Sequence, residues 1–194
     1  MPHITRDSLM TLEAYAKARE GFRARIMEHK KNRTLRLGTN VTLIFEDELT
    51  IRYQVQEMLR VERIFDERGI EDELAAYNPL IPDGSNWKAT MMIEYPDPDQ
   101  RRQMLAKLIG IENKVWVKIE GHRRIYANAD EDLERENAEK TSSVHFLRFE
   151  LEEAMVRSFR RGARLSVGID HPHCNVLVED VAPAVRGSLL DDLA

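Results

Sequence analysis

The sequence predicts an α+β protein with a mostly antiparallel sheet, built from hairpins and packed by five or six helices. Several short runs alternate apolar and polar residues and are joined by turns rich in Gly and Asn, a pattern typical of hairpins. Other stretches repeat apolar residues at spacings of three and four, which predicts amphipathic helices. Strands and helices do not follow one another in the regular order of parallel β–α–β units.

The first half of the chain is predicted to be mainly helical. Helix-capping residues at 5–8 predict a helix over about 7–19, Gly21 is expected to interrupt it, and residues 22–29 continue as a second helix. Residues 34–47 predict a hairpin around Gly38 and Asn40. The stretch 48–69 is predicted to be helical in its main part and to stop at Gly69, before a shorter helix over 70–78.

The second half mixes strands and helices. The first elements expected are a loop at 79–86, a strand at 87–95, a helix at 99–108 and a hairpin at 115–127. A polar tract at 130–141 follows, which is a surface helix or a long loop. The last elements expected are a strand at 144–151, a basic amphipathic helix at 151–162, a strand at 164–170, and a strand end with a short helix in the tail from 179.

The length of 194 residues favours a single domain over 1–194. The alternative is a subdivision near 79–87, with a mainly helical part at 1–78 that contains one hairpin and a mixed part at 88–194.

Composition excludes several function classes. The net charge is −5, so the chain lacks the basic footprint of a nucleic-acid binder, and the basic runs at 29–33 and 157–164 are interpreted as solvated helix faces. Cys174 is the only cysteine, which leaves no internal disulfide and no iron–sulfur cluster built from the chain's own thiols. With no apolar run of about 20 residues and no signal-like start, we expect a cytoplasmic protein.

Sequence signatures of catalysis are absent. The chain has no glycine-rich phosphate loop, nucleophile elbow or HExxH motif. Ser142 and Ser143 are interpreted as capping residues before a strand, and the adjacent pair His173 and Cys174 would point to opposite faces of a strand.

One helix face combines Tyr53, Glu57 and Arg60, which recur at spacings of four and three, beside a row with Gln56 and Arg63. Buried polar groups need hydrogen-bond partners, so such a face often lines a site or an interface. The simpler alternative is a surface helix that carries Glu–Arg pairs.

Histidines and carboxylates form a second candidate site. His145 lies in an apolar strand and His171 at a strand end; with Glu57 or Glu62 they could hold iron, manganese or zinc. Structural, hydrogen-bonded core histidines are the alternative. Lys88, which follows the loop at 79–86, could meet a phosphate or carboxylate ligand, or could be a charge that protects an edge strand.

Long segments of the chain resemble one family. FEDELTIRYQVQEMLRVERIF, ELAAYNPLIPDGSNWKATMMIEYPD, VWVKIEG and ADEDLERENAEKTSSVHFLRFEL are similar to the bacterial domain of unknown function 3501, over about residues 1–175. The segment HPHCNV departs from the family's tail, which favours His171 over His173 and Cys174 as a functional residue.

The resemblance implies a context rather than a reaction. Members of the family tend to be encoded beside a rubrerythrin-like diiron protein and a cysteine-rich iron–sulfur oxidoreductase. The first hypothesis is therefore an accessory protein of a redox or oxidative-stress system that binds these proteins through the face around Tyr53 to Arg63. The sequence leaves open whether the protein forms a homo-oligomer. Nucleic acid and membrane are not expected partners.

The second hypothesis is a metal-dependent enzyme that uses non-haem iron or manganese. His145 and His171 would be metal ligands, and Glu57 or Glu62 would be a carboxylate ligand or base. Arg60 or Lys88 would hold a small anionic substrate.

Overall fold

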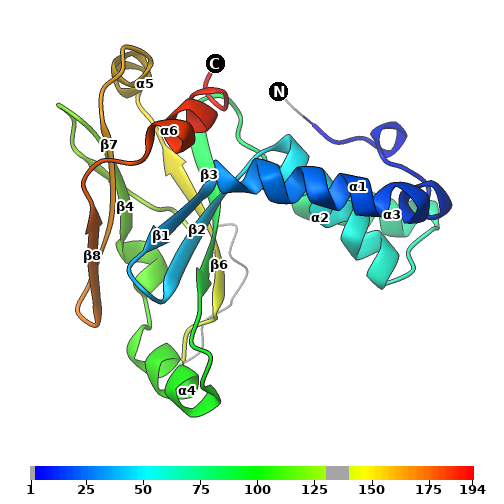
Figure 1. The fold of residues 1–194 in the computed structure, drawn as a ribbon, viewed down its shortest axis with the longest axis horizontal. Helices are drawn as coiled ribbons and strands as arrows, with labels where there is room; N and C mark the ends of the chain where they lie inside the picture. The colour runs from blue at the N-terminus through cyan, green and yellow to red at the C-terminus, as the bar shows by residue number, and fades with distance from the viewer. Residues whose placement is uncertain (1–2, 130–139) are drawn as a thin grey trace.

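The computed structural model describes residues 3–129 and 140–194 (Figure 1). In these ranges, eight strands form two four-stranded antiparallel sheets accompanied by six α-helices, which confirms the predicted α+β class. Of the polar tract at 130–141, only Lys140 and Thr141 are described, so its predicted form lies outside the described residues. No helix within the described ranges has the length and apolar content needed to cross a membrane.

The first sheet has the order β1-β2-β3-β6. Its strands are β1 (Thr34–Leu37), β2 (Val41–Glu46), β3 (Asn86–Ile93) and β6 (Val144–Glu150). The predicted hairpin at 34–47 is confirmed, with Leu37 opposite Val41. Gly38 has a φ of 68° in its turn, a left-handed conformation that suits glycine.

The second sheet has the order β5-β4-β7-β8. Its strands are β4 (Val115–Ile119), β5 (Arg124–Tyr126), β7 (Leu165–His171) and β8 (Cys174–Val178). The predicted hairpin at 115–127 is confirmed as β4–β5. Reciprocal backbone hydrogen bonds of 2.8 Å between Asn128 and Arg148 join the chain after β5 to β6 of the first sheet.

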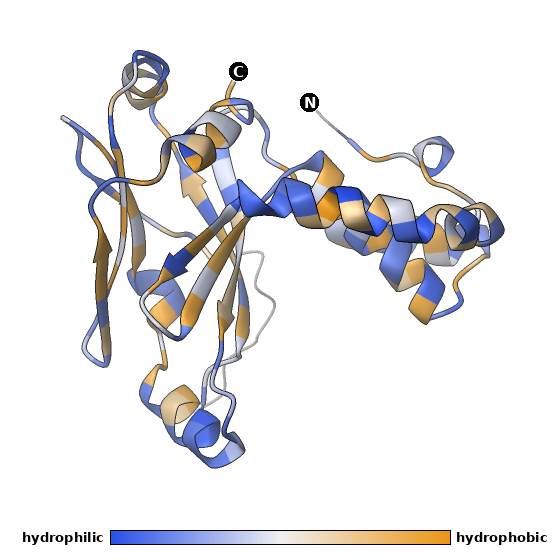
Figure 2. Ribbon diagram, viewed as in Figure 1, coloured by the Kyte–Doolittle hydropathy of each residue, from blue (hydrophilic) through white to orange (hydrophobic). Residues whose placement is uncertain are grey.

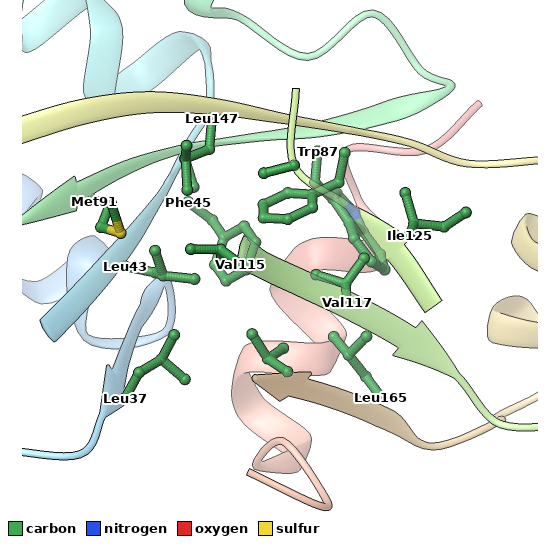
Figure 3. Packing of buried hydrophobic residues seen from close by; sticks show 14 of the residues in the cluster. Leu37, Leu43, Phe45, Trp87, Met91, Val115, Val117, Ile125, Leu147 and Leu165 are labelled. Atoms are coloured by element: carbon green, nitrogen blue, oxygen red, sulfur yellow. The ribbon is translucent and has the colours of Figure 1, made fainter. Parts of the chain in front are cut away.

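The two sheets pack through one continuous hydrophobic core and form what we call the sandwich (Figure 3). The first sheet contributes Phe45, Trp87 and Leu147, and the second contributes Val117 and Leu165, all 2% exposed or less. Antiparallel sheets commonly bury one face and solvate the other, so the alternating sequence pattern of the strands follows from this packing.

Three helices lie around the sandwich: α4 (Pro98–Lys107), α5 (Glu153–Arg160) and α6 (Pro183–Leu190). Short 3₁₀ helices are η1 (Arg6–Ser8), η2 (Asn78–Leu80) and η3 (Ile111–Lys114). The indole N–H of Trp87 donates to the carbonyl of Leu189 at 2.9 Å and so holds α6 against the core.

The other three helices form an arm that extends away from the sandwich (Figure 1). They are α1 (Leu12–Lys31), α2 (Glu48–Val61) and α3 (Glu67–Tyr77). Hydrophobic and hydrophilic residues lie side by side on these helices (Figure 2), as expected of helices that pack through one face. A second hydrophobic cluster, which includes Ile51, Val55 and Leu59 of α2, holds the arm together.

Two sequence predictions about the arm are wrong. Helix α1 runs through Gly21 without interruption, because a single exposed glycine costs a helix only about 1 kcal/mol relative to alanine and does not block its hydrogen bonds. Helix α2 ends at Val61 instead of Gly69, and Arg63 turns the chain with a φ of 55°. Asp66 then caps α3 by accepting the Gly69 N–H at 2.9 Å, so Gly69 lies in the first turn of a helix rather than at its end.

The segment at 79–87 connects the arm to the sandwich. Leu80 and Ile81 are buried in the cluster of the arm, and Trp87 is buried in the core of the sandwich. The hairpin β1–β2 pairs with β3, so a boundary near 79–87 would pass through the first sheet. Whether residues 1–194 behave as one domain stays a prediction.

Candidate functional site

The polar face of α2 packs inside the arm, where Glu57 is the centre of a hydrogen-bond network. Its carboxylate accepts from the Tyr15 hydroxyl at 2.7 Å, from Arg19 Nε and Nη2 at 2.7 and 2.9 Å, and from Arg60 Nη2 at 3.1 Å. The ring of Tyr53 lies edge-on to Phe22 of α1. This predicted face therefore joins α2 to α1.

The environment of Glu57 favours the carboxylate. The hydrogen bond with Arg19 is the main reason that the pKa of Glu57 falls to about 2, while the desolvation of its carboxyl opposes the shift. Burial, followed by the hydrogen bond to Glu57, raises the pKa of Tyr15. A carboxylate that is so fully hydrogen-bonded is a poor proton acceptor near neutral pH, and this arrangement supports a structural role for Glu57.

The other candidates from the first half of the chain lie apart from Glu57 or have protein partners. Glu62 follows α2 at the exposed end of the arm. Lys88 donates a hydrogen bond to the carbonyl of Pro79. Of the two roles considered for Lys88, that of a charge on an edge strand is wrong, because β3 lies between β2 and β6.

His145 is a buried residue of β6, with 1% of its surface exposed. Its Nε2 lies 2.9 Å from Thr141 Oγ1 and 3.1 Å from the carbonyl of Ser142. These contacts fit a structural histidine that is hydrogen-bonded within the core.

His171 uses both ring nitrogens within the protein. Its Nε2 lies 3.1 Å from the carbonyl of Ile109, and its Nδ1 accepts the His173 N–H at 3.2 Å. These bonds fit the tautomer that carries a proton on Nε2, and they fix the β7–β8 turn. A metal ligand needs a free nitrogen lone pair, and the one on Nδ1 is already engaged.

The four predicted metal ligands, His145, His171, Glu57 and Glu62, are not brought together. Within residues 3–129 and 140–194, no group of three or more His, Cys, Asp or Glu side chains is arranged to hold a metal ion. The metal-dependent enzyme stays a prediction, which metal analysis of the purified protein would test.

The outer end of the arm carries an apolar groove of about 510 Å³. It is lined by Leu9, Met10, Leu12, Leu59, Ile64, Phe65 and Ile70, with Arg6 at its side. The turn between α2 and α3 presents Val61 and Phe65 to solvent, with 58% and 78% of their surface exposed. We call the groove together with the exposed residues Val61 and Phe65 the arm tip. The feature of the sequence that indicates it is the apolar pair Ile64–Phe65 within a charged stretch.

A charged cleft of about 660 Å³ lies at the root of the arm. Its walls come from the end of α1, the start of α2, residues 81–84 and the chain after Ser188. Inside it, His29 Nε2 lies 2.6 Å from Asp47 Oδ2, and Asp47 also caps α2 by accepting the Thr50 N–H at 2.9 Å. The sequence signal for this pair is the capping sequence DELT directly after a strand.

Arg33 anchors the floor of this cleft and is 1% exposed. Its guanidinium donates to the carbonyls of Phe45 at 2.8 Å and Glu46 at 3.0 Å, and it also pairs with Asp192. Burial raises the pKa of Asp192 to about 6, although Arg33 acts in the opposite direction. Sequence analysis placed Arg33 on a solvated face, because the burial depends on Asp192, which is far away along the chain.

Comparison with known proteins agrees with the sequence resemblance. No curated protein matches the chain. A crystal structure of a novel protein of unknown function from Burkholderia pseudomallei K96243 is similar over 100% of both chains, with 55% sequence identity and a TM-score of 0.95. The model of the family described as protein of unknown function (DUF3501) matches residues 3–193. The chain therefore belongs to the DUF3501 family.

Proposed function

We propose that this protein is a cytoplasmic accessory protein of a bacterial redox or oxidative-stress system and acts by protein–protein interaction. The proposed partners are a rubrerythrin-like protein and a cysteine-rich iron–sulfur oxidoreductase. The observation that carries the proposal is the arm tip, where Phe65 is 78% exposed beside an apolar groove. Large exposed aromatic side chains beside a groove are typical of the centre of a protein interface.

The construction of the arm supports this role. The network around Glu57 and the cluster around Val55 hold its helices together. The N-terminal segment is fixed to the arm as well, since Gln56 Oε1 accepts the Met10 N–H at 2.7 Å and Asn78 Oδ1 accepts the Ile4 N–H at 2.9 Å. A rigid support lowers the entropy that binding costs, so the exposed residues at its end are suited to docking.

The contact residues in this proposal differ from those expected from the sequence. Tyr53 and Glu57 of the predicted face contact α1, whereas Arg63 is exposed in the turn that presents Phe65. The proposed interface is therefore centred on Val61, Arg63 and Phe65. Charge reversal at Arg60 would disturb the bond to Glu57 and would not report cleanly on docking.

We expect Phe65→Asp to weaken binding to the rubrerythrin-like or iron–sulfur partner at least tenfold, because removing a central aromatic anchor typically costs about 2 kcal/mol or more. Arg63→Glu is expected to weaken it less. Isothermal titration calorimetry of the purified partner with each purified variant measures the affinity, and a pull-down checks the result.

Leu177→Asp is the matched control, because Leu177 is also a large exposed apolar residue, at 52%, but lies on β8 of the sandwich. It should bind like the unmodified protein. Unchanged binding of both Phe65→Asp and Arg63→Glu would overturn the assignment to the arm tip. Absence of binding by the unmodified protein to either partner would overturn the proposed function itself.

A further inference from the structure

The charged cleft at the root of the arm is separate from the proposed docking surface. Helix α2 has 14 residues and begins at the cleft, while its other end leads to the arm tip, so the two surfaces are about 20 Å apart. A volume near 660 Å³ lies within the range typical of sites for small molecules, roughly 300–1,000 Å³.

Most charged groups in the cleft have a partner within it. Arg33 pairs with Asp192 and Arg52 with Glu48, and His29 is hydrogen-bonded to Asp47. Asp83 accepts hydrogen bonds from the backbone N–H and the hydroxyl of Ser85 at 2.9 and 2.8 Å. These contacts give the cleft fixed walls.

Two groups of opposite charge remain without a partner among the described residues. Arg25 projects from α1 on one side, and Asp191 follows α6 on the other. Both line the cleft, and the side chain of neither forms a hydrogen bond or ion pair with another described residue. A ligand that carries both a negative and a positive group would satisfy both.

His29 adds a further polar group to the lining of the cleft. Asp47 holds its Nε2, its other ring nitrogen has no partner in the described chain, and 30% of its side chain is exposed. A histidine held through one nitrogen presents the other in a fixed direction, where it can accept a hydrogen bond from an ammonium group.

The charge balance decides the class of ligand. Three arginines line the cleft, against the five acidic side chains Asp47, Glu48, Asp83, Asp191 and Asp192. A simple anion would lie beside excess carboxylates, and a simple diamine would leave the guanidinium of Arg25 without a partner. A zwitterion with a further positive charge would satisfy Arg25 and also complement the acidic excess.

We propose that the cleft binds a basic amino acid, with the carboxylate of the ligand on Arg25, one ammonium group on Asp191, and the other donating to the second ring nitrogen of His29. The probe is L-lysine, compared with cadaverine, which lacks the carboxylate, with hexanoate, which lacks both amines, and with L-glutamate. Calorimetry and thermal unfolding of the full chain measure binding.

We expect L-lysine to bind and to raise the unfolding temperature, and the other three compounds to bind at least tenfold more weakly. Arg25→Ala and Asp191→Ala should each reduce the affinity for L-lysine about tenfold, the cost of one lost charged contact. Arg23→Ala is the control, because Arg23 is exposed on the same helix but does not line the cleft. It should bind L-lysine as the unmodified protein does.

Three results would overturn the proposal: no binding of L-lysine at millimolar concentration, equal binding of hexanoate or cadaverine, or full affinity in both Arg25→Ala and Asp191→Ala. Circular dichroism of each variant establishes that the fold is intact. Because Arg25 is remote from Phe65, failure here leaves docking at the arm tip unaffected, and the two proposals are tested separately.

Discussion

Two carboxylates of this protein are each bound to an arginine, yet their pKa values shift in opposite directions. Glu57 is 21% exposed and accepts from three side chains, so hydrogen bonds to its charged form prevail and its pKa falls. Asp192 is 6% exposed, and the loss of hydration outweighs its pairing with Arg33, so its pKa rises. The balance between burial and the number of donors decides which effect wins.

The lowered pKa of Glu57 predicts a loss of stability in acid. The folded state holds this carboxyl ionised down to about pH 2, whereas its ordinary pKa is 4.5, so its contribution is present above pH 4.5 and is lost as the pH falls towards 2. We expect Glu57→Gln to cost about 1–2 kcal/mol at pH 7, after allowance for solvent screening, and much less at pH 2.5. Urea unfolding at both pH values measures the difference.

Glu13→Gln is the control for this experiment. Glu13 also pairs with a cation, Lys17, but its side chain is 83% exposed. Exposed pairs at this spacing contribute about 0.5 kcal/mol or less, so its effect should be small at both pH values. A pH-independent effect of Glu57→Gln would contradict the assigned ionisation.

The candidate site was harder to predict than the elements that carry it. His145 and His171 were placed correctly on strands, but the partner of His171, the carbonyl of Ile109, lies 62 residues away along the chain. Spacing identified the shared face of Tyr53 and Glu57, but it could not show that α1 covers that face. Contacts between distant segments decide whether a polar side chain belongs to a functional site or stabilises the fold.

At the scale of the elements, sequence patterns predicted the strands better than the ends of the helices. Alternation identified both β1–β2 and β4–β5, because only the correct register buries one face of each hairpin. Two glycines lie within helices rather than at their ends. Gly21 lies within α1 and Gly69 in the first turn of α3, since the cap of Asp66 and the packing of the arm outweigh local propensity.

Gly21 therefore predicts a stabilising substitution. A Cβ at this position meets nothing within 4 Å, and the backbone is helical, so Gly21→Ala should stabilise the protein by about 0.5–1 kcal/mol. Thermal and urea unfolding measure the change. The contrasting variant is Gly168→Ala, whose Cβ would lie 2.4 Å from Trp116 and 2.7 Å from the carbonyl of Val176 and should destabilise the sandwich. Loss of stability in Gly21→Ala would mean that the glycine has a role beyond the helix.

At the scale of the whole molecule, the arm and the sandwich have separate hydrophobic clusters but interleaved chain segments. The chain leaves the arm after α1, forms β1 and β2 in the sandwich, and returns to the arm with α2. Phe146 of β6 packs against the cluster of the arm, and Arg33 ties the end of α1 to the carbonyls of Phe45 and Glu46. Unfolding of the arm would therefore break contacts within the sandwich.

This coupling predicts that the chain unfolds as one cooperative unit, as expected of a single domain over residues 1–194. The two tryptophans, Trp87 and Trp116, both lie in the sandwich, so their fluorescence reports on that part alone. Far-ultraviolet circular dichroism is dominated by helices, and the longest ones, α1 and α2, form the arm. We expect the two signals to change at the same urea concentration. If the circular dichroism signal is lost first, the arm is a separate unit made of α1, α2 and α3, and the hairpin between them belongs to the sandwich.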